Sequence, residues 1–320
     1  MVDLGNTHQG RKSMGKIAFI YPGQGVQTAG MGADFYRNSA VARDIFERAS
    51  EAVGFDMKAL CFEKNDRLDL TEYTQVAIVT ACLAMTKAVV EAGLEPDMTA
   101  GLSLGEYAAI VTAGGMDEMD AIRLVRKRGL LMQEAVPAGV GGMCAVIGLE
   151  AEKIEKVLSD SEDVSIANYN CPGQIVITGK KESVEDAAER LKKTGAVGTV
   201  MLNVSGPFHS SFLIPAGNEL AKELEHISLR PLRIPYIANV TAQKVEETVE
   251  IKELLTRQVS SPVRWMQSME TMLAEGVEQF VEIGPGKTLA GFMRKINKKY
   301  KVLNISGWED VAKVKESLQR

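Results

Sequence analysis

The stretch Met98-Thr-Ala-Gly-Leu-Ser-Leu-Gly-Glu-Tyr-Ala-Ala-Ile110 decides the fold of this chain. It has the pattern of a short strand, an abrupt turn and a helix, with Ser103 at the turn inside Gly-x-Ser-x-Gly. Gly101 and Gly105 carry no Cβ that would block close packing of strand against helix. The pattern predicts a nucleophile elbow that exposes the Ser103 hydroxyl. The free N–H of Leu104 at the helix start would stabilise a negative oxygen beside it.

Length and composition bound what surrounds this elbow. A chain of 320 residues allows one large α/β domain, or a main domain carrying a small inserted one. Hydrophobic residues at 45% and charged residues at 25% are typical of a globular enzyme, and no apolar run is long enough to span a bilayer. The net charge of -5 argues against nucleic-acid binding.

The termini and cysteines bear on the compartment. The four cysteines show no Cys-x-x-Cys pairing, so the sequence predicts neither a zinc site nor a disulfide framework. Free cysteines fit a reducing cytoplasm best. The first 13 residues are polar and lack a signal-peptide core, so folded structure is expected to begin near Met14.

A buried strand and a glycine-rich loop precede the elbow, at residues 16–21 and 22–32. A dinucleotide fingerprint would need glycine at Thr28, and a P-loop would need lysine at Met31, so we reject nucleotide binding. The Gln24 backbone amide is instead a candidate second oxyanion donor, opposite Leu104.

The remaining pattern predicts an α/β fold, a mostly parallel sheet flanked by helices, with an inserted ferredoxin-like βαββαβ subdomain. The insertion would place Ser103 in a cleft between the two units. Expected domain bounds are 14–138 and 207–310 for the large hydrolase-like subdomain and 139–206 for the small one. Strands are expected at 143–147, 164–168, 174–178, 197–204, 234–238, 279–283 and 301–305, and helices within 33–94 (the longest at 71–90) and at 117–135, 151–158, 182–193, 219–225, 251–259 and 263–276. Gly284-Pro-Gly-Lys-Thr288 lacks the first glycine of a Walker motif and reads as a strand-to-helix turn.

A serine nucleophile needs a base, and the chain has only three histidines. His8 lies in the polar leader, and His226 ends a charged helix, where a cation suits the helix dipole. His209, in the loop that rejoins the main domain, is the remaining candidate. The sequence shows no clear candidate for the acid of a Ser-His-acid triad. A backbone carbonyl is the alternative partner for the imidazole.

Arg128 is predicted to point inward, because helical periodicity puts it on the same face as Leu124 and Leu131. A buried guanidinium cannot lose its proton and needs an anion. The sequence offers two partners: Asp117 or Glu118 at the start of the same helix, or the carboxylate of a substrate.

Six motifs in order show a resemblance that spans nearly the whole chain from Met14 onward. They are Pro22-Gly-Gln-Gly25, Gly101-Leu-Ser-Leu-Gly-Glu106, Val125-Arg-Lys-Arg-Gly129, Asn168-Tyr-Asn-Cys-Pro-Gly-Gln174, Gly206-Pro-Phe-His-Ser210 and Glu282-Ile-Gly-Pro-Gly-Lys287. With them the chain resembles the malonyl-CoA:acyl carrier protein transacylases, the acyltransferase family of type II fatty acid synthesis. The family usually has histidine directly before the serine, where this chain has Leu102.

The resemblance implies a ping-pong acyl transfer. Ser103 would take malonyl from CoA as an ester and pass it to the phosphopantetheine thiol of acyl carrier protein, with His209 as base and then acid. By motif, the amides of Gln24 and Leu104 would form the oxyanion hole, and Arg128 would bind the malonyl carboxylate. The main-chain carbonyl of Gln258 would orient the histidine, and Phe208 would narrow the pocket around the acyl α-carbon.

No metal or cofactor beyond these two substrates is implied, and a cytoplasmic monomer that binds neither nucleic acid nor membrane is expected. A cluster of positive charges near the C-terminus suggests a docking surface for the acidic carrier protein, or a solvated helix face. They are Arg294, Lys295, Lys298, Lys299 and Lys301, called the basic cluster below.

Three other readings stay open. An acyltransferase or acyl hydrolase of a polyketide pathway would use the same serine and histidine. An α/β-hydrolase esterase would need a late acid followed by histidine and a His-Gly-Gly oxyanion loop, which the sequence lacks. A carrier-protein binding module with an incidental serine is the non-enzymatic alternative.

Overall fold

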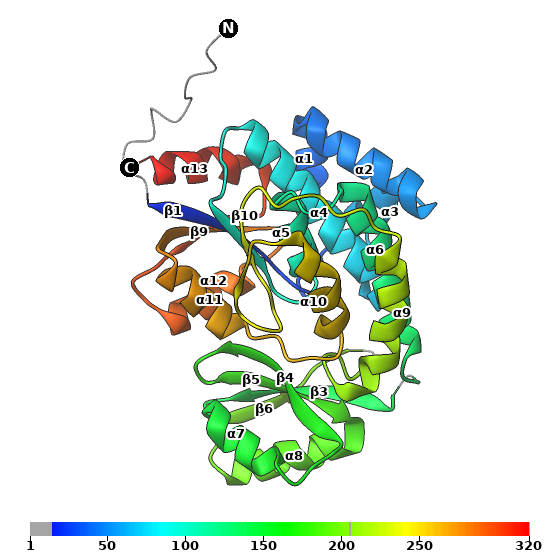
Figure 1. Ribbon diagram of the computed structural model, residues 1–320, viewed down its shortest axis with the longest axis vertical. Coiled ribbons are helices and arrows are strands. Elements are labelled where there is room, and N and C mark those ends of the chain that lie inside the picture. The colour runs from blue at the N-terminus through cyan, green and yellow to red at the C-terminus, as the bar shows by residue number, and fades with distance from the viewer. Residues whose placement is uncertain (1–14, 138, 205, 320) are drawn as a thin grey trace, which may run out of the picture.

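Two β-sheets organise the computed structural model, which describes residues 15–137, 139–204 and 206–319 (Figure 1). The larger sheet, with its helices, forms the upper part of the molecule in this view, and the smaller sheet lies below it with α7 and α8 on its outer side. Met14 and the polar leader with His8 lie outside the described residues.

The larger sheet is mixed but mostly parallel, as the sequence predicts. Its strands follow the order β10-β9-β1-β2-β7-β8, and only the β7–β8 pair is antiparallel. The carboxyl ends of the parallel strands therefore meet at one edge, where ligands bind in such sheets. The strands are β1 Lys16–Tyr21, β2 Met98–Gly101, β7 Tyr236–Ile237, β8 Lys244–Val245, β9 Val277–Ile283 and β10 Val302–Ile305.

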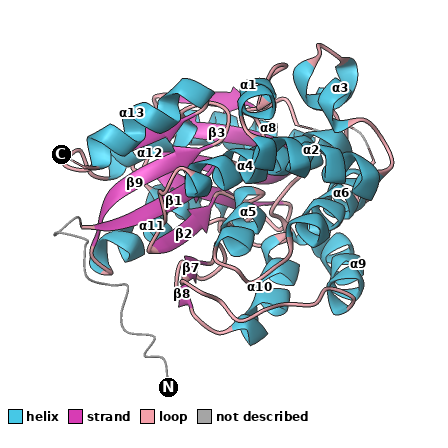
Figure 2. Cartoon of the chain, turned by 90° about the horizontal axis from the view of Figure 1, so that it is seen from above, coloured by secondary structure: helices cyan, strands magenta, loops and turns pink. Residues whose placement is uncertain are grey.

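Alternate residues of β1 enter two separate cores, because a strand covered on both faces buries both sets of side chains. Phe19 and Tyr21 join the core under α4, whereas Ala18 and Ile20 join the one under α11 and α12. Figure 2 shows helices on both faces of this sheet. The helices of the larger unit are α1 Ala33–Asn38, α2 Ala40–Val53, α3 Met57–Phe62, α4 Thr71–Glu91, α5 Gly105–Thr112, α6 Glu118–Glu134, α9 Ile214–Glu225, α10 Ile251–Gln258, α11 Trp265–Ala274, α12 Thr288–Ile296 and α13 Trp308–Leu318, with 3-10 turns η1 Asp66–Asp69, η2 Ser211–Leu213 and η3 Thr248–Glu250.

Among the described helices, only α4 is long and apolar enough to cross a membrane, judged by its length and composition alone. Within the fold, 83% of its most apolar 18 residues are buried. Its side chains pack on α2, α5 and α6 in the main core, so α4 is a core helix.

The smaller sheet has the order β4-β5-β3-β6 with antiparallel pairs throughout. With α7 and α8 this gives the expected βαββαβ order and a core of its own. Its elements are β3 Gly141–Ile147, α7 Ala151–Leu158, β4 Val164–Cys171, β5 Gln174–Lys180, α8 Lys181–Lys193 and β6 Gly198–Met201. The prediction of a strand over 197–204 is wrong in length. The strand β6 lies at the sheet edge, and Val197 and Val200 are 83% and 57% exposed, so this apolar run does not mark a buried strand.

Several other boundaries differ from the sequence expectation, and two of the differences add buried residues to helices. The helix α9 begins at Ile214 instead of residue 219, with Pro215 in its first turn. The expected end of the large unit at residue 310 falls inside α13, whose Val311, Val314 and Leu318 are buried in the main core.

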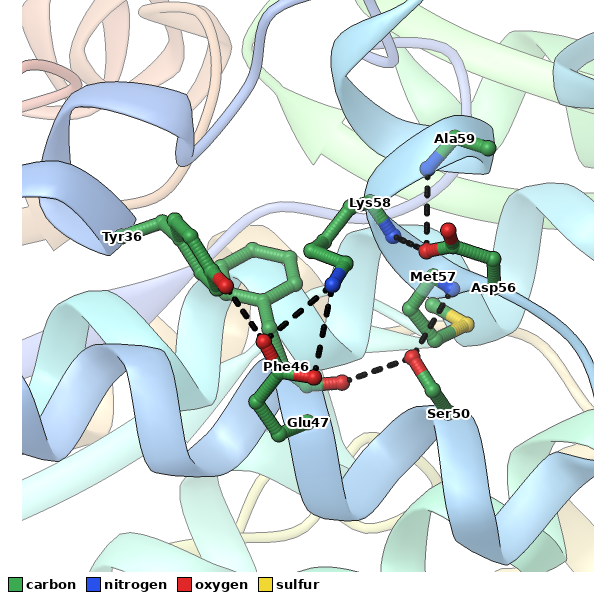
Figure 3. Close-up of polar contacts among 8 residues, drawn as sticks. All are labelled: Tyr36, Phe46, Glu47, Ser50, Asp56, Met57, Lys58 and Ala59. Atoms are coloured by element: carbon green, nitrogen blue, oxygen red, sulfur yellow. Dashed lines mark hydrogen bonds and ion pairs between the residues drawn. The ribbon is translucent and has the colours of Figure 1, made fainter.

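Polar contacts join α2 to α3 on the outside of the larger unit (Figure 3). Lys58 Nζ lies 3.2 Å from Glu47 Oε1, and the Tyr36 hydroxyl also donates to Glu47. Ser50 Oγ accepts from the Met57 amide at 3.0 Å, and Asp56 caps the start of α3. These bonds fix the corner between the two helices.

The four cysteines, Cys61, Cys82, Cys144 and Cys171, are free thiols and are buried. Burial raises the pKa of each thiol above its ordinary value.

Candidate active site

Ser103 sits in the strand-turn-helix that the sequence predicts, between β2 and α5. Its φ is +50°, a strained value for a residue that is not glycine. A Cβ on Gly101 would lie 1.9 Å from the Gly105 carbonyl carbon, and a Cβ on Gly105 would lie 2.3 Å from the Tyr21 oxygen. Both glycines are therefore required by the close approach of backbone to backbone at this turn.

Asn239, distant in sequence from this turn, holds it through hydrogen bonds of its side chain. Its Oδ1 accepts from the Ser103 backbone N–H at 2.6 Å, and its Nδ2 donates to the Gly101 oxygen at 2.6 Å. One carboxamide thus satisfies a donor and an acceptor of the elbow, which stabilises a backbone conformation that is costly by itself.

His209 is the histidine that the fold brings to the serine. Its Nε2 lies 2.7 Å from Ser103 Oγ, and its Nδ1 lies 2.9 Å from the Gln258 main-chain oxygen. Because a carbonyl only accepts, Nδ1 carries the hydrogen and Nε2 presents a lone pair to the serine hydroxyl. Burial, together with the positive charge of Arg128, lowers the His209 pKa to about 4. His226 is exposed at the end of α9.

Arg128 is 1% exposed and contacts neutral groups instead of a carboxylate. Its Nη1 donates to Gln75 Oε1 at 2.8 Å, and its Nη2 donates to Gln258 Oε1 at 2.9 Å and to Ser103 Oγ at 3.3 Å. The internal salt bridge considered from the sequence is absent, because Asp117 pairs with Arg230 and Glu118 pairs with Lys87.

The site opens into a cleft of about 290 Å³ between the two sheets. Ser103, His209 and Arg128 lie in its wall, and Met143, Asn168 and Val176 line it from the smaller sheet. Other residues of the sequence prediction that line it are Gln24, Leu104, Phe208 and Leu102, the last in the position where the resembled family has histidine.

The two residues whose amides are predicted to form an oxyanion hole, Gln24 and Leu104, both line this cleft. Among the described residues, neither the Gln24 nor the Leu104 backbone N–H donates a hydrogen bond. Leu104 also precedes the first residue of α5, where the helix dipole adds positive potential. Both donors are available to a negative oxygen on a group bound at Ser103.

Sequence reasoning missed three polar partners of these residues. Gln75 accepts from the Arg128 side chain, and Asn239 accepts from the Ser103 backbone N–H. Glu106 accepts from Gln258 Nε2. One signal was available for Asn239: it lies two residues after β7, at the carboxyl edge of the mostly parallel sheet. Asn170, quoted in another motif, lines the cleft with a buried Oδ1 that lacks a partner among the described residues.

Comparison with known proteins identifies close relatives along almost the full length. The family of acyl transferase domains matches residues 18–315. The malonyl CoA-acyl carrier protein transacylase of Bacillus subtilis is 43% identical over 303 residues, which cover 93% of this chain and 96% of the relative. The crystal structure of the malonyl CoA-acyl carrier protein transacylase from Clostridium perfringens superposes with a TM-score of 0.92 at 42% identity, covering 95% of this chain and 97% of that one. A malonyl-transacylase in complex with a type II polyketide synthase acyl-carrier protein superposes with a TM-score of 0.91 at 38% identity, covering 94% and 99%.

Proposed function

This chain belongs to the acyl transferase domain family, and from that premise and its site geometry we propose that it is an acyl-carrier-protein S-malonyltransferase. It transfers malonyl from malonyl-CoA to the phosphopantetheine thiol of acyl carrier protein through a malonyl-serine ester. The observation that carries the proposal is the pair of contacts on Ser103 Oγ, from His209 Nε2 at 2.7 Å and from Arg128 Nη2 at 3.3 Å. The first activates a nucleophile, and the second places an unpaired cation beside it.

The first half-reaction forms the ester. Ser103 Oγ attacks the thioester carbonyl while His209 Nε2 takes the hydroxyl proton. The carbonyl oxygen becomes negative and accepts from the amides of Gln24 and Leu104. Collapse of the tetrahedral intermediate breaks the carbon–sulfur bond, and His209 returns the proton to the CoA sulfur.

The second half-reaction runs through the same atoms. The phosphopantetheine thiol gives its proton to His209 and attacks the ester carbonyl, and the proton then passes to Ser103 Oγ. The low pKa of His209 keeps the imidazole neutral between turnovers, and the Gln258 carbonyl holds it in the tautomer that presents Nε2. These steps need no metal or cofactor.

Arg128 gives the donor preference. A guanidinium shielded from water and surrounded by amides has an unsatisfied charge that a malonyl carboxylate would neutralise. Phe208, next to the base and 6% exposed, would limit the room at the acyl α-carbon. We propose that together they select an unbranched dicarboxylic acyl group.

The carrier protein would dock at the mouth of the cleft. Thr288 and Phe292 of α12 line the cleft, and the basic cluster lies at the end of α12 and just beyond it. All five side chains of the cluster are exposed, which suits an acidic partner. We further infer a monomer that works in the cytoplasm, where free thiols persist.

We also propose that the chain divides as a large unit interrupted by a small one near residues 139–206. The separate core of the smaller sheet supports this division. The large unit would then run to α13 instead of ending at residue 310.

A carrier protein of a polyketide pathway is the second candidate acceptor. The solved complex of a related malonyl-transacylase with a type II polyketide carrier favours it. Transfer rates to purified carrier proteins of both pathways separate the two possibilities.

The direct test of the function is label transfer from radiolabelled malonyl-CoA. The wild type should show label on Ser103 that chases to added carrier protein, and Ser103→Ala should show none while remaining folded. His209→Ala should be similarly impaired, since the two groups act as a unit. Near-normal transfer by Ser103→Ala would refute the proposed mechanism, and binding of malonyl-CoA without a covalent label would indicate a binding module.

A further inference from the structure

Glu106 is a buried carboxyl beside the active site that the transfer steps above do not use. It is 1% exposed and does not line the cleft. Its Oε2 accepts from Gln258 Nε2 at 2.6 Å and from the Asn239 backbone N–H at 3.3 Å. The same carboxyl oxygen thus contacts two residues that themselves hold the nucleophile, the base and Arg128.

The carboxamide of Gln258 has two possible orientations, and its neighbours allow only one. In the observed orientation Nε2 donates to Glu106 Oε2 and to the Ser103 oxygen at 2.9 Å, while Oε1 accepts from Arg128 Nη2 at 2.9 Å. The opposite orientation would set an NH₂ against the guanidinium and an oxygen against two acceptors. Glu106 therefore helps to decide that an acceptor faces Arg128.

From these contacts we propose that Glu106 is a positioning residue that orients the Gln258 carboxamide, and so holds the Arg128 guanidinium in place for the carboxylate of the acyl donor. This inference rests on the proposed malonyl transfer. The inference adds to that function a residue, Glu106, that touches no substrate and sets donor selectivity through Gln258 and Arg128.

The protonation state of Glu106 fits this role. Burial raises its pKa to about 8, although Gln258, Asn239 and Arg128 each lower it in part. The titratable groups that face it are Arg128 on α6, Tyr107 on α5 and Tyr236 on β7.

Burial raises the pKa of both tyrosines, so they stay neutral, and Arg128 is the one charged neighbour among these groups. A neutral Glu106 leaves the charge of Arg128 free for a substrate carboxylate. An ionised Glu106 would offset that charge and weaken the preference for an anionic donor.

The test compares Glu106→Gln with Glu106→Leu. Glutamine keeps an acceptor for Gln258 and is permanently neutral, whereas leucine has a similar size and no acceptor. We measure kcat/KM for malonyl-CoA and acetyl-CoA in the wild type and both variants, and normalise each rate to the fraction of Ser103 that a saturating acyl donor labels. The ratio of malonyl to acetyl should fall by about three- to tenfold in Glu106→Leu, the scale of one lost hydrogen bond between neutral groups, and should hold in Glu106→Gln.

A pH series needs only the wild type and Glu106→Gln, so it stands even if the leucine variant does not fold. The malonyl-to-acetyl ratio of the wild type should fall as pH rises from 7 through about 8, where Glu106 ionises, and that of Glu106→Gln should stay level. Parallel pH profiles, or an unchanged ratio in Glu106→Leu, would overturn the inference. Absence of malonyl transfer in the wild type would instead mean that the proposed function is wrong.

Discussion

Removing the Arg128 side chain should separate its role toward substrate from its role in packing. Arg128→Ala deletes the cation nearest Ser103 Oγ, at 3.3 Å, and leaves the serine and His209 in place. A hydrogen bond between charged groups contributes about 1.5–3 kcal/mol, so we expect kcat/KM for malonyl-CoA to fall by about 10- to 150-fold. Acetyl-CoA has no carboxylate to lose a partner, so its kcat/KM should hold or rise.

The structure supplies a matched control on the same helix. Arg126 also lies on α6, but its Nη1 pairs with Glu72 Oε2 at 2.5 Å and its guanidinium lies 4.5 Å from the centre of the Tyr73 ring. Arg126→Ala should leave the malonyl-to-acetyl ratio unchanged. The malonyl-to-acetyl ratio of Arg128→Lys should lie between those of the wild type and Arg128→Ala. An ammonium keeps the charge but loses the planar guanidinium that reaches Gln75 and Gln258 together.

The assay is steady-state transfer to carrier protein with each donor, on proteins that circular dichroism shows to be folded. That check matters because Arg128→Ala leaves Gln75 Oε1 without its donor, which costs about 1–3 kcal/mol of folding free energy. Loss of an unpaired buried charge offsets part of this cost. An equal fall for both donors would show that Arg128 is structural and would refute the reasoning.

Three further predictions address other parts of the site. Asn239→Ala removes both 2.6 Å bonds to the elbow, so the rate of Ser103 acylation should fall by about tenfold or more, with little change in the malonyl-to-acetyl ratio; an unaltered rate would mean that the turn holds itself. Phe208 should make methylmalonyl-CoA a poor donor, since overpacking costs about 1–3 kcal/mol, and equal kcat/KM for malonyl- and methylmalonyl-CoA in the wild type would contradict this. Lys298→Glu combined with Lys299→Glu should raise KM for carrier protein and spare KM for malonyl-CoA, whereas two unchanged values would leave the basic cluster as a solvated surface.

The features that the sequence predicts well are those set by neighbouring residues. Backbone sterics at Gly101 and Gly105 define the elbow, and helical periodicity turns Arg128 inward, so both can be read from short windows. The helix α13 was missed although Val311, Val314 and Leu318 follow helical spacing, with charged residues on the opposite face.

The features that the sequence does not predict are contacts between distant segments. Gln258 and Asn239 reach the elbow from more than 130 residues away, in positions set by how α10 and the β7–β8 turn pack. The two glutamines that accept from Arg128, Gln75 and Gln258, likewise come from separate helices. Propensity and periodicity carry no information on such pairings, so the sequence left the neighbours of the guanidinium undecided.

The burial of all four cysteines has a consequence for an enzyme of thioester chemistry. Such a protein works among activated thioesters, whose acyl groups would transfer to any accessible thiolate by S-acylation and release the original thiol. Cys61, Cys82, Cys144 and Cys171 are each at most 1% exposed, and burial raises the pKa of every one, so thiolates do not form at the surface. Self-modification at sulfur is thereby suppressed, and an acyl group that enters the cleft meets an activated oxygen at Ser103.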